Sequence, residues 1–234
     1  MADYNYFPDV RAGDDPFVGV FVGRKGSGKT TLLMDLLKSV WKLKFNLIVI
    51  VSPTFSTQNV SSEIEDGRGI VIIPEFRLSI IDELAAYQLD KILERERILS
   101  TPKEFVVGSL KVPEVHHALL IFDDIGTLGK EGKLAVQLAN LAYIVRHRNV
   151  SIIELAQRIT LASTGLSSQA DVWIFFCEQN PNERVNIFRR IGFGNNVTFW
   201  NIFDRETSEV RAWIGIRNIS GRNIFFNKEG FISC

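Results

Sequence analysis

The sequence predicts an α/β fold in which a mostly parallel sheet is flanked by helices and ends in a C-terminal β-hairpin. Two observations support the parallel sheet. Several short segments, among them residues 17–22, 46–51, 69–73 and 118–122, are apolar without alternation, as expected for strands buried on both faces. Segments with the apolar spacing of amphipathic helices separate them, and the longest covers residues 77–99. Strands that alternate with helices indicate a layered α/β domain.

A glycine-rich loop joins the first predicted strand to a helix predicted over residues 30–41. From Gly23 to Thr30 it fits the pattern G-x-x-x-x-G-K-[ST], whose backbone N–H groups point at phosphate oxygens beside the positive end of a helix. We therefore predict a nucleoside triphosphate site. Lys29 is expected to reach the β- and γ-phosphates, and the Thr30 hydroxyl to bind Mg²⁺. The predicted contacts are Gly23, Arg24, Lys25, Gly26, Ser27, Gly28, Lys29, Thr30 and Thr31.

Two acidic residues follow the most apolar predicted strand. Asp123 and Asp124 come directly after residues 118–122, which places them at the carboxyl edge of the sheet beside the loop. We predict that Asp123 binds Mg²⁺, directly or through a water molecule, and that Asp124 orients or deprotonates the attacking water. The alternative is an acidic turn after a core strand, with no catalytic role.

The next predicted strand supplies a third candidate. Gln157 closes the strand over residues 150–156, so its amide is predicted near the γ-phosphate, where it could sense whether that phosphate is present. The alternative is a polar strand terminus without a ligand. Glu154 lies inside the same strand, where a carboxylate is unusual, and we expect either an edge position or a salt-bridge partner for it.

The other predicted elements surround this centre. They are a helix over residues 134–145, a strand over 171–177, a short helix opened by Pro181 and capped by Asn180, and hairpin strands over 210–216 and 223–227. Residues 55–68 and 100–116 are expected to form loops. We expect an N-terminal arm over residues 1–15 and a single domain over residues 16–234.

Composition narrows the class of protein. The 234 residues are 46% hydrophobic, enough for a sizeable core, and the 27 basic residues balance 27 acidic ones, so no overall positive charge indicates a polyanionic partner. Cys177 and Cys234 are too few for a disulfide framework and suggest a reducing compartment. The cysteines and three histidines lack zinc-ligand spacing. No signal peptide and no membrane segment are predicted, so we expect an intracellular protein.

Five short segments occur in an order that resembles the DNA-packaging ATPases of large DNA viruses, virophages and related tailless viruses. These enzymes are a poxvirus- and virophage-type branch of the FtsK–HerA superfamily. The segments are Gly23 to Thr30, Ser52-Pro53-Thr54, Leu120 to Asp124, Arg146-His147 and Ile152 to Gln157. The phosphate loop alone is common to many families, whereas the acid pair, the Arg-His pair and the strand-terminal Gln together are more specific.

The resemblance implies a pentameric or hexameric ring that uses ATP and Mg²⁺ to pump double-stranded DNA into a preformed capsid. Its partners would be capsid vertex or portal proteins. It would be located in the host cytoplasm or virus factory, and also in the virion. It implies that Lys29 and Thr30 contact phosphate and metal, Asp123 binds metal, Asp124 is the catalytic acid and Gln157 the sensor. It also implies an arginine from the neighbouring subunit, for which Arg146 and Arg148 are the first choices.

The chain departs from the family pattern at two places. Many relatives have Glu where this chain has Asp124, and several have an arginine where this chain has Ser167-Ser168-Gln169.

Two other functions remain open. One is a small-molecule kinase, although no arginine-rich lid segment is evident, and the other is a non-motor nucleotide switch or assembly factor. DNA-stimulated phosphate release would separate the motor from both.

Overall fold

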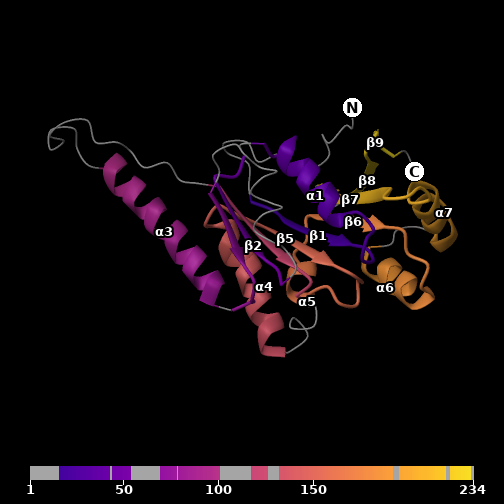
Figure 1. Ribbon diagram of the computed structural model, residues 1–234, viewed down its shortest axis with the longest axis horizontal. Helices are drawn as coiled ribbons and strands as arrows, with labels where there is room; N and C mark the ends of the chain where they lie inside the picture. The colour runs from indigo at the N-terminus through magenta and orange to yellow at the C-terminus, as the bar shows by residue number, and fades with distance from the viewer. Residues whose placement is uncertain are drawn as a thin grey trace.

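The computed structural model describes residues 16–42, 44–53, 69–77, 79–100, 117–125, 132–191, 195–219 and 222–232. Within these residues the strands join into one nine-stranded sheet with the order β3-β2-β4-β5-β1-β6-β7-β8-β9 (Figure 1). The strands are β1 (Val18–Val22), β2 (Leu47–Val51), β3 (Gly69–Ile73), β4 (Ala118–Asp123), β5 (Val150–Ala156), β6 (Val172–Phe176), β7 (Trp213–Ile219), β8 (Arg222–Asn227) and β9 (Gly230–Phe231).

The sheet has a parallel part and an antiparallel part. Strands β1 to β6 run parallel to one another, and β7, β8 and β9 extend the sheet beyond β6 as antiparallel strands. The predicted mixture of a parallel sheet and a C-terminal hairpin is therefore confirmed. Strand β5 lies between β4 and β1, in the middle of the sheet, so the predicted edge position for Glu154 is wrong.

Helices cover both faces of the sheet. They are α1 (Lys29–Lys38), α3 (Ser79–Ser100), α4 (Gly132–Arg146), α5 (Thr164–Ser167), α6 (Pro181–Ile191) and α7 (Asn196–Glu206). Figure 1 shows α1 on one side of the sheet and α4, α5 and α6 on the other. The long helix α3 extends away from the sheet, and its buried side chains, Ile80, Ile81, Leu84 and Gln88, all lie in its first half.

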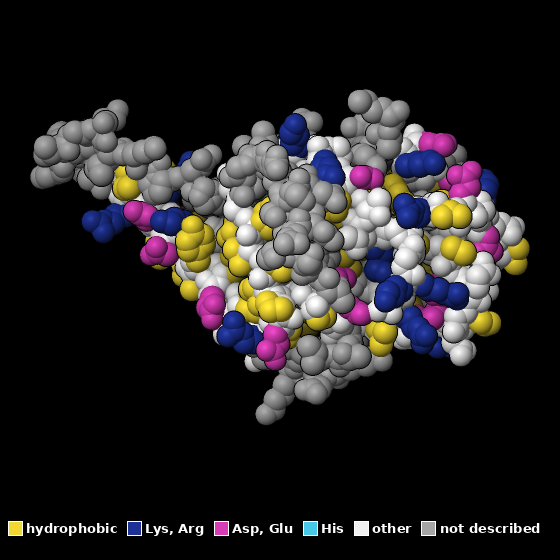
Figure 2. Space-filling view, viewed as in Figure 1, with side chains coloured by type: hydrophobic (Ala, Val, Ile, Leu, Met, Phe, Trp, Pro, Cys, Tyr) yellow, Lys and Arg dark blue, Asp and Glu magenta, His cyan; other side chains and the backbone are white. Residues whose placement is uncertain are grey.

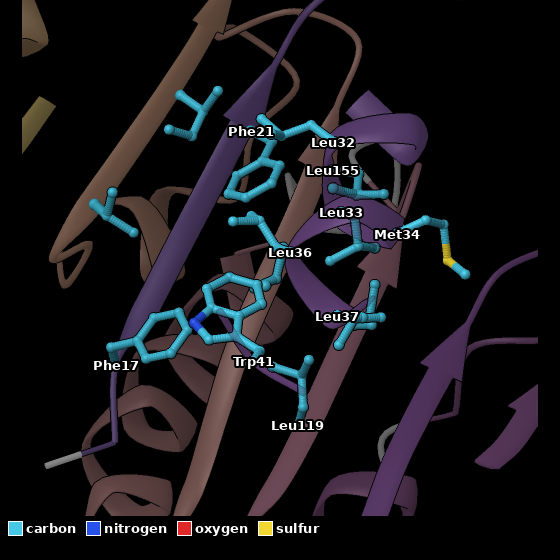
Figure 3. Packing of buried hydrophobic residues seen from close by; sticks show 14 of the residues in the cluster. Phe17, Phe21, Leu32, Leu33, Met34, Leu36, Leu37, Trp41, Leu119 and Leu155 are labelled. Atoms are coloured by element: carbon cyan, nitrogen blue, oxygen red, sulfur yellow. The ribbon is translucent and has the colours of Figure 1, made fainter. Parts of the chain in front are cut away.

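The packing of α1 fixes the phosphate loop against the sheet. Its apolar side is formed by Leu32, Leu33, Leu36 and Leu37, which are buried against residues such as Phe21 of β1 (Figure 3). Truncating one such leucine to alanine typically costs about 2–5 kcal/mol. The helix that begins with the loop lysine is thus anchored along its length by the core.

The structure differs from the sequence-based expectations in the end of one helix and in several elements that were not predicted. Helix α1 ends at Lys38 rather than near Trp41, because the Trp41 N–H turns back to the carbonyl of Leu36 and its ring packs on Phe17 and Phe45. Helices α5 and α7 and the short strand β9 were not predicted. The predicted arm over residues 1–15 and most of the predicted loops lie outside the described residues.

None of the helices in the described part of the chain is long and apolar enough to span a membrane.

Candidate nucleotide-binding and hydrolysis site

One edge of the sheet collects the residues singled out from the sequence. Because β4, β5 and β1 are adjacent and parallel, the loop after β1, the acid pair after β4 and Gln157 after β5 all lie at the same carboxyl edge. Backbone hydrogen bonds continue past the strand ends. The Gly23 N–H donates to the carbonyl of Ala156 at 3.0 Å, and the Asp124 N–H donates to the carbonyl of Leu155 at 3.1 Å.

The phosphate loop has the backbone that anion binding requires. Gly28 has φ 108° and Gly26 has φ 79°, in the left-handed region that glycine tolerates without strain. The Ser27 hydroxyl is buried and makes no hydrogen bond to any described residue, so it is available to a phosphate oxygen. An unpartnered buried hydroxyl beside a helix N-terminus fits the binding of a polyphosphate.

Lys29 lies under this loop and close to the acid pair. Its side chain is only 9% exposed, and its ammonium donates hydrogen bonds to the carbonyls of Gly23 and Arg24. Burial lowers the pKa of Lys29, and the nearby carboxylates of Asp123 and Asp124 act in the opposite direction. The cation is therefore positioned between the phosphate loop and the acids.

The two acids have different partners. Asp123 accepts a 2.7 Å hydrogen bond from the hydroxyl of Ser52, which is buried at the end of the neighbouring strand β2. Asp124 adopts φ 59° and accepts a hydrogen bond from the side-chain amide of Gln157. The different contacts suit different tasks, since Asp123 is fixed from one side while Asp124 is coupled to the end of β5.

The donor atoms at this edge fit Mg²⁺. Magnesium prefers oxygen ligands and usually binds through one or two carboxylates together with substrate phosphates and water. Thr30 supplies an exposed hydroxyl at the start of α1, and Asp123 supplies an oriented carboxylate. Within the described ranges no cluster of three or more His, Cys, Asp or Glu side chains converges, so the fit rests on this smaller donor set.

Two site residues were missed by the sequence analysis. Ser52 was noted only as part of a motif, and its contact with Asp123 depends on the adjacency of β2 and β4. Glu178, which follows β6, is buried and accepts a 3.0 Å ion-pair hydrogen bond from Arg24 of the phosphate loop, as well as one from the Asn180 N–H. Glu178 thus ties the phosphate loop to the segment that precedes α6.

Glu154 is a buried carboxylate behind the site. It is 1% exposed, and one of its oxygens accepts a 2.8 Å hydrogen bond from the Ser163 N–H, while the other has no hydrogen-bond partner among the described residues. Burial raises the pKa of Glu154 to about 7, and the hydrogen bond and the positive charge of Arg190 on α6 oppose the rise. Glu183 of α6 holds the same loop at Thr160.

We expect the replacement Glu154→Gln to remove a pH dependence of stability. Between pH 4.5 and about 7 the folded chain keeps a proton on Glu154 that the unfolded chain has lost, so the free energy of unfolding falls as the pH rises. The full difference corresponds to roughly 3 kcal/mol. Urea unfolding at pH 5 and pH 8 checks this. Wild type should lose stability relative to the variant at pH 8, and equal pH dependence would contradict the assignment.

The candidate arginines lie far from this edge in the same chain. Arg146 ends α4, and Arg148 lies in the turn before β5, so both are at the end of β5 opposite to Gln157. Seven residues of strand separate the two ends by roughly 20 Å. Among the other arginines, Arg184 is already engaged, because it pairs with Asp204 through two hydrogen bonds and stacks on Trp200. Arg158 and Arg189 are exposed.

The fold and the site together define a P-loop NTPase: a parallel sheet, a glycine-rich loop between β1 and α1, and an acid pair at the carboxyl end of β4. The model of the family described as Poxvirus A32 protein matches residues 7–196. The chain therefore belongs to this family, which confirms the resemblance to viral packaging ATPases that the sequence motifs indicated. No match was found among curated proteins.

Solved structures share the fold. The genome packaging NTPase B204 from Sulfolobus turreted icosahedral virus 2, in complex with AMPPCP, is 18% identical with a TM-score of 0.61, over 93% of this chain and 99% of that one. The DNA-packaging ATPase B204 from Sulfolobus Turreted Icosahedral Virus is 17% identical with a TM-score of 0.60, over 92% and 98%. The type VII secretion ATPase EccC from Thermomonospora curvata is 15% identical with a TM-score of 0.53, over 91% of this chain and 25% of that one.

Proposed function

We propose that this chain is an ATP-hydrolysing motor that translocates double-stranded viral DNA into a preformed capsid. The observation that carries the proposal is the contact between the second acid and the strand-terminal amide, Asp124 and Gln157, beside the buried Lys29. A kinase needs a place for a second substrate, whereas a carboxylate paired with an amide could hold and activate an attacking water molecule, which supports hydrolysis. Family membership and the similarity to packaging NTPases of other viruses support the same conclusion.

The residues at the edge divide the work of hydrolysis. The loop N–H groups and Lys29 would hold the β- and γ-phosphates, and Lys29 would exchange its loop carbonyls for phosphate oxygens. Asp123 and Thr30 would hold Mg²⁺, which neutralises charge that develops on the phosphates. Asp124 would orient the water and accept its proton. Because Gln157 donates to Asp124, loss of the γ-phosphate would be transmitted to β5 and the loop that follows it.

Cationic side chains suit one part of the surface for contact with DNA. Figure 2 shows dark blue Lys and Arg side chains gathered over the part of the molecule where α6 lies in Figure 1. Helix α6 itself carries Arg184, Arg189 and Arg190. Since the whole chain has no net charge, a local cluster of this kind is what contacts with DNA phosphates require.

The proposal is tested by phosphate release with and without DNA. We expect double-stranded DNA to stimulate hydrolysis by the purified protein, with a stimulation that weakens as salt rises. Heparin, an anion of comparable charge, and single-stranded DNA serve as controls. Stimulation by a small-molecule acceptor that becomes phosphorylated would show a kinase. ATP binding with no hydrolysis under any of these conditions would show a nucleotide switch.

We also propose that the active form is a ring in which a neighbour's Arg146 or Arg148 completes the site. The position of these residues at the opposite end of β5 supports action across an interface rather than within one chain. Planar guanidinium groups neutralise the charge of a γ-phosphoryl transition state. Capsid vertex or portal proteins and a location in the infected cell complete the proposal for this motor.

The neighbour's arginine is tested with mixed rings. Alanine at Arg146 or Arg148 should leave ATP binding and assembly intact but slow hydrolysis by at least ~10³-fold. Mixing that variant with Lys29→Ala subunits should restore part of the activity, since each variant supplies what the other lacks at a shared interface. Co-assembly without any rescue would exclude both arginines and direct attention to the exposed Arg158 and Arg189.

A further inference from the structure

A cavity of about 270 Å³ lies next to the phosphate loop, on the side away from the acids. Its lining combines Gly28 and Thr31 at the start of α1 with residues 209–213, the turn that joins α7 to β7. It shares Gly28 with the phosphate loop, so the two sites are contiguous. Sites that enclose a whole drug-sized ligand measure about 300–1,000 Å³, so this cavity suits one part of a larger ligand.

The strand order indicates which part of a bound nucleotide would face this cavity. The acids and Gln157 follow β4 and β5, which lie on one side of β1, whereas β6 and β7 lie on the other side. An extended triphosphate with its γ-phosphate beside Asp124 and Gln157 crosses the phosphate loop from one side of β1 to the other. Its nucleoside then emerges toward the turn before β7, where the cavity lies.

Arg211 covers this end of the loop in an unusual conformation. It has φ 65°, and only two other described residues that are not glycine, Asp124 and Asn149, have positive φ. Unlike Asn and Asp, arginine gains no local hydrogen bond in the left-handed region, and such residues gather at ligand sites. Its stem lies against the loop, since a Cβ placed on Gly28 would be 3.2 Å from both Cβ and Cγ of Arg211.

The turn that carries Arg211 is firmly held. The Ala212 N–H donates to the carbonyl of Glu209. Trp213, at the start of β7, is buried, and its ring packs edge-on against Phe226 with the ring centroids 5.9 Å apart. Val210, also in the cavity lining, is 93% exposed, which is unusual for an apolar side chain in a fixed turn. A planar cation beside an exposed aliphatic side chain forms a surface on which a nucleobase can stack.

We propose that this cavity holds the nucleoside of the bound nucleotide and that the Arg211 guanidinium stacks on its base. The carboxylates of Asp35 and Glu209, in the same lining, supply acceptors for ribose hydroxyls. The inference rests on the proposed ATPase function, because it assigns the second half of the same ligand. It makes Arg211 a residue that recognises the nucleoside and not the phosphates.

The test compares ATP with inorganic tripolyphosphate, which has the phosphates of ATP but no nucleoside. Equilibrium binding of each, with Mg²⁺, is measured by calorimetry on wild type, Arg211→Ala and Arg211→Gly. Glycine adopts φ 65° without strain, so the second variant keeps the turn even if alanine disturbs it. Arg95→Ala, an exposed arginine on the projecting helix α3, is the matched control.

We expect both Arg211 variants to bind ATP about tenfold or more weakly, the effect of losing one stacking partner, while tripolyphosphate binds within about twofold of wild type. The control should bind both ligands normally. Unchanged ATP affinity in the Arg211 variants, or equal weakening of ATP and tripolyphosphate, overturns the inference. Failure of wild type to bind either ligand would instead overturn the proposed function on which the inference rests.

Discussion

Replacing Lys29 with alanine is expected to abolish ATP hydrolysis. Lys29 is buried, and its ammonium is held by loop carbonyls beside the acid pair, where it would meet the β- and γ-phosphates. Removing one fixed donor from a developing oxyanion costs about 10²–10³-fold in rate, and a full positive charge contributes at least as much. Steady-state phosphate release at saturating ATP gives the measurement.

Lys42→Ala is the control for Lys29. Lys42 is exposed and lies beyond the far end of α1, so its loss removes a lysine from the same segment without touching the phosphate loop. The control should hydrolyse ATP at the wild-type rate. Normal turnover by Lys29→Ala would show that the nucleotide does not bind at this loop. The roles assigned to the other residues at the carboxyl edge of the sheet would then be wrong as well.

Replacing Asp124 with asparagine should separate binding from hydrolysis. Asparagine tolerates the left-handed φ 59° as well as aspartate does, so the turn after β4 is kept. Its amide cannot accept the proton of the attacking water, and Lys29, Thr30 and Asp123 remain to hold ATP. General-base catalysis contributes about 10²–10⁴-fold, so hydrolysis should fall by that factor while the dissociation constant for ATP changes little.

The matched control for this variant is Asp90→Asn on the exposed side of α3. It makes the same chemical change at a distance from the site and should leave both binding and turnover intact. If Asp124→Asn lost ATP binding together with hydrolysis, Asp124 would be a structural or metal-binding residue, and the division of roles between the two acids would be wrong.

Most of the helices and strands could be predicted from local sequence patterns. The mostly apolar segment from Val150 to Ala156 and the motif from Gly23 to Thr30 are determined by residues adjacent in the chain, so the strand was predicted with correct bounds and the start of α1 to within one residue. Helix α7 could also have been found, since Asn195 caps it and Phe199, Ile202 and Phe203 have helical spacing. That signal was overlooked.

The remaining contacts depend on strand order, which no local pattern reveals. Ser52 reaches Asp123 only because β2 lies beside β4, and Glu154 is buried only because β5 is central. The packing of Arg211 on Gly28 joins residues from opposite ends of the chain, and it requires the antiparallel extension of the sheet at β7. The predicted roles of Arg146 and Arg148 involve a second subunit, so they remain predictions.

Displacement of a third strand from duplex DNA tests the motor most directly. A triplex-forming oligonucleotide is annealed at increasing distances from the end of a linear duplex, and its release is followed in time after the protein and ATP are added. A translocating ring should release it only with ATP, after a lag that lengthens with distance, and Asp124→Asn should bind ATP without releasing it. DNA-stimulated hydrolysis with no displacement at any distance would contradict the proposed packaging motor.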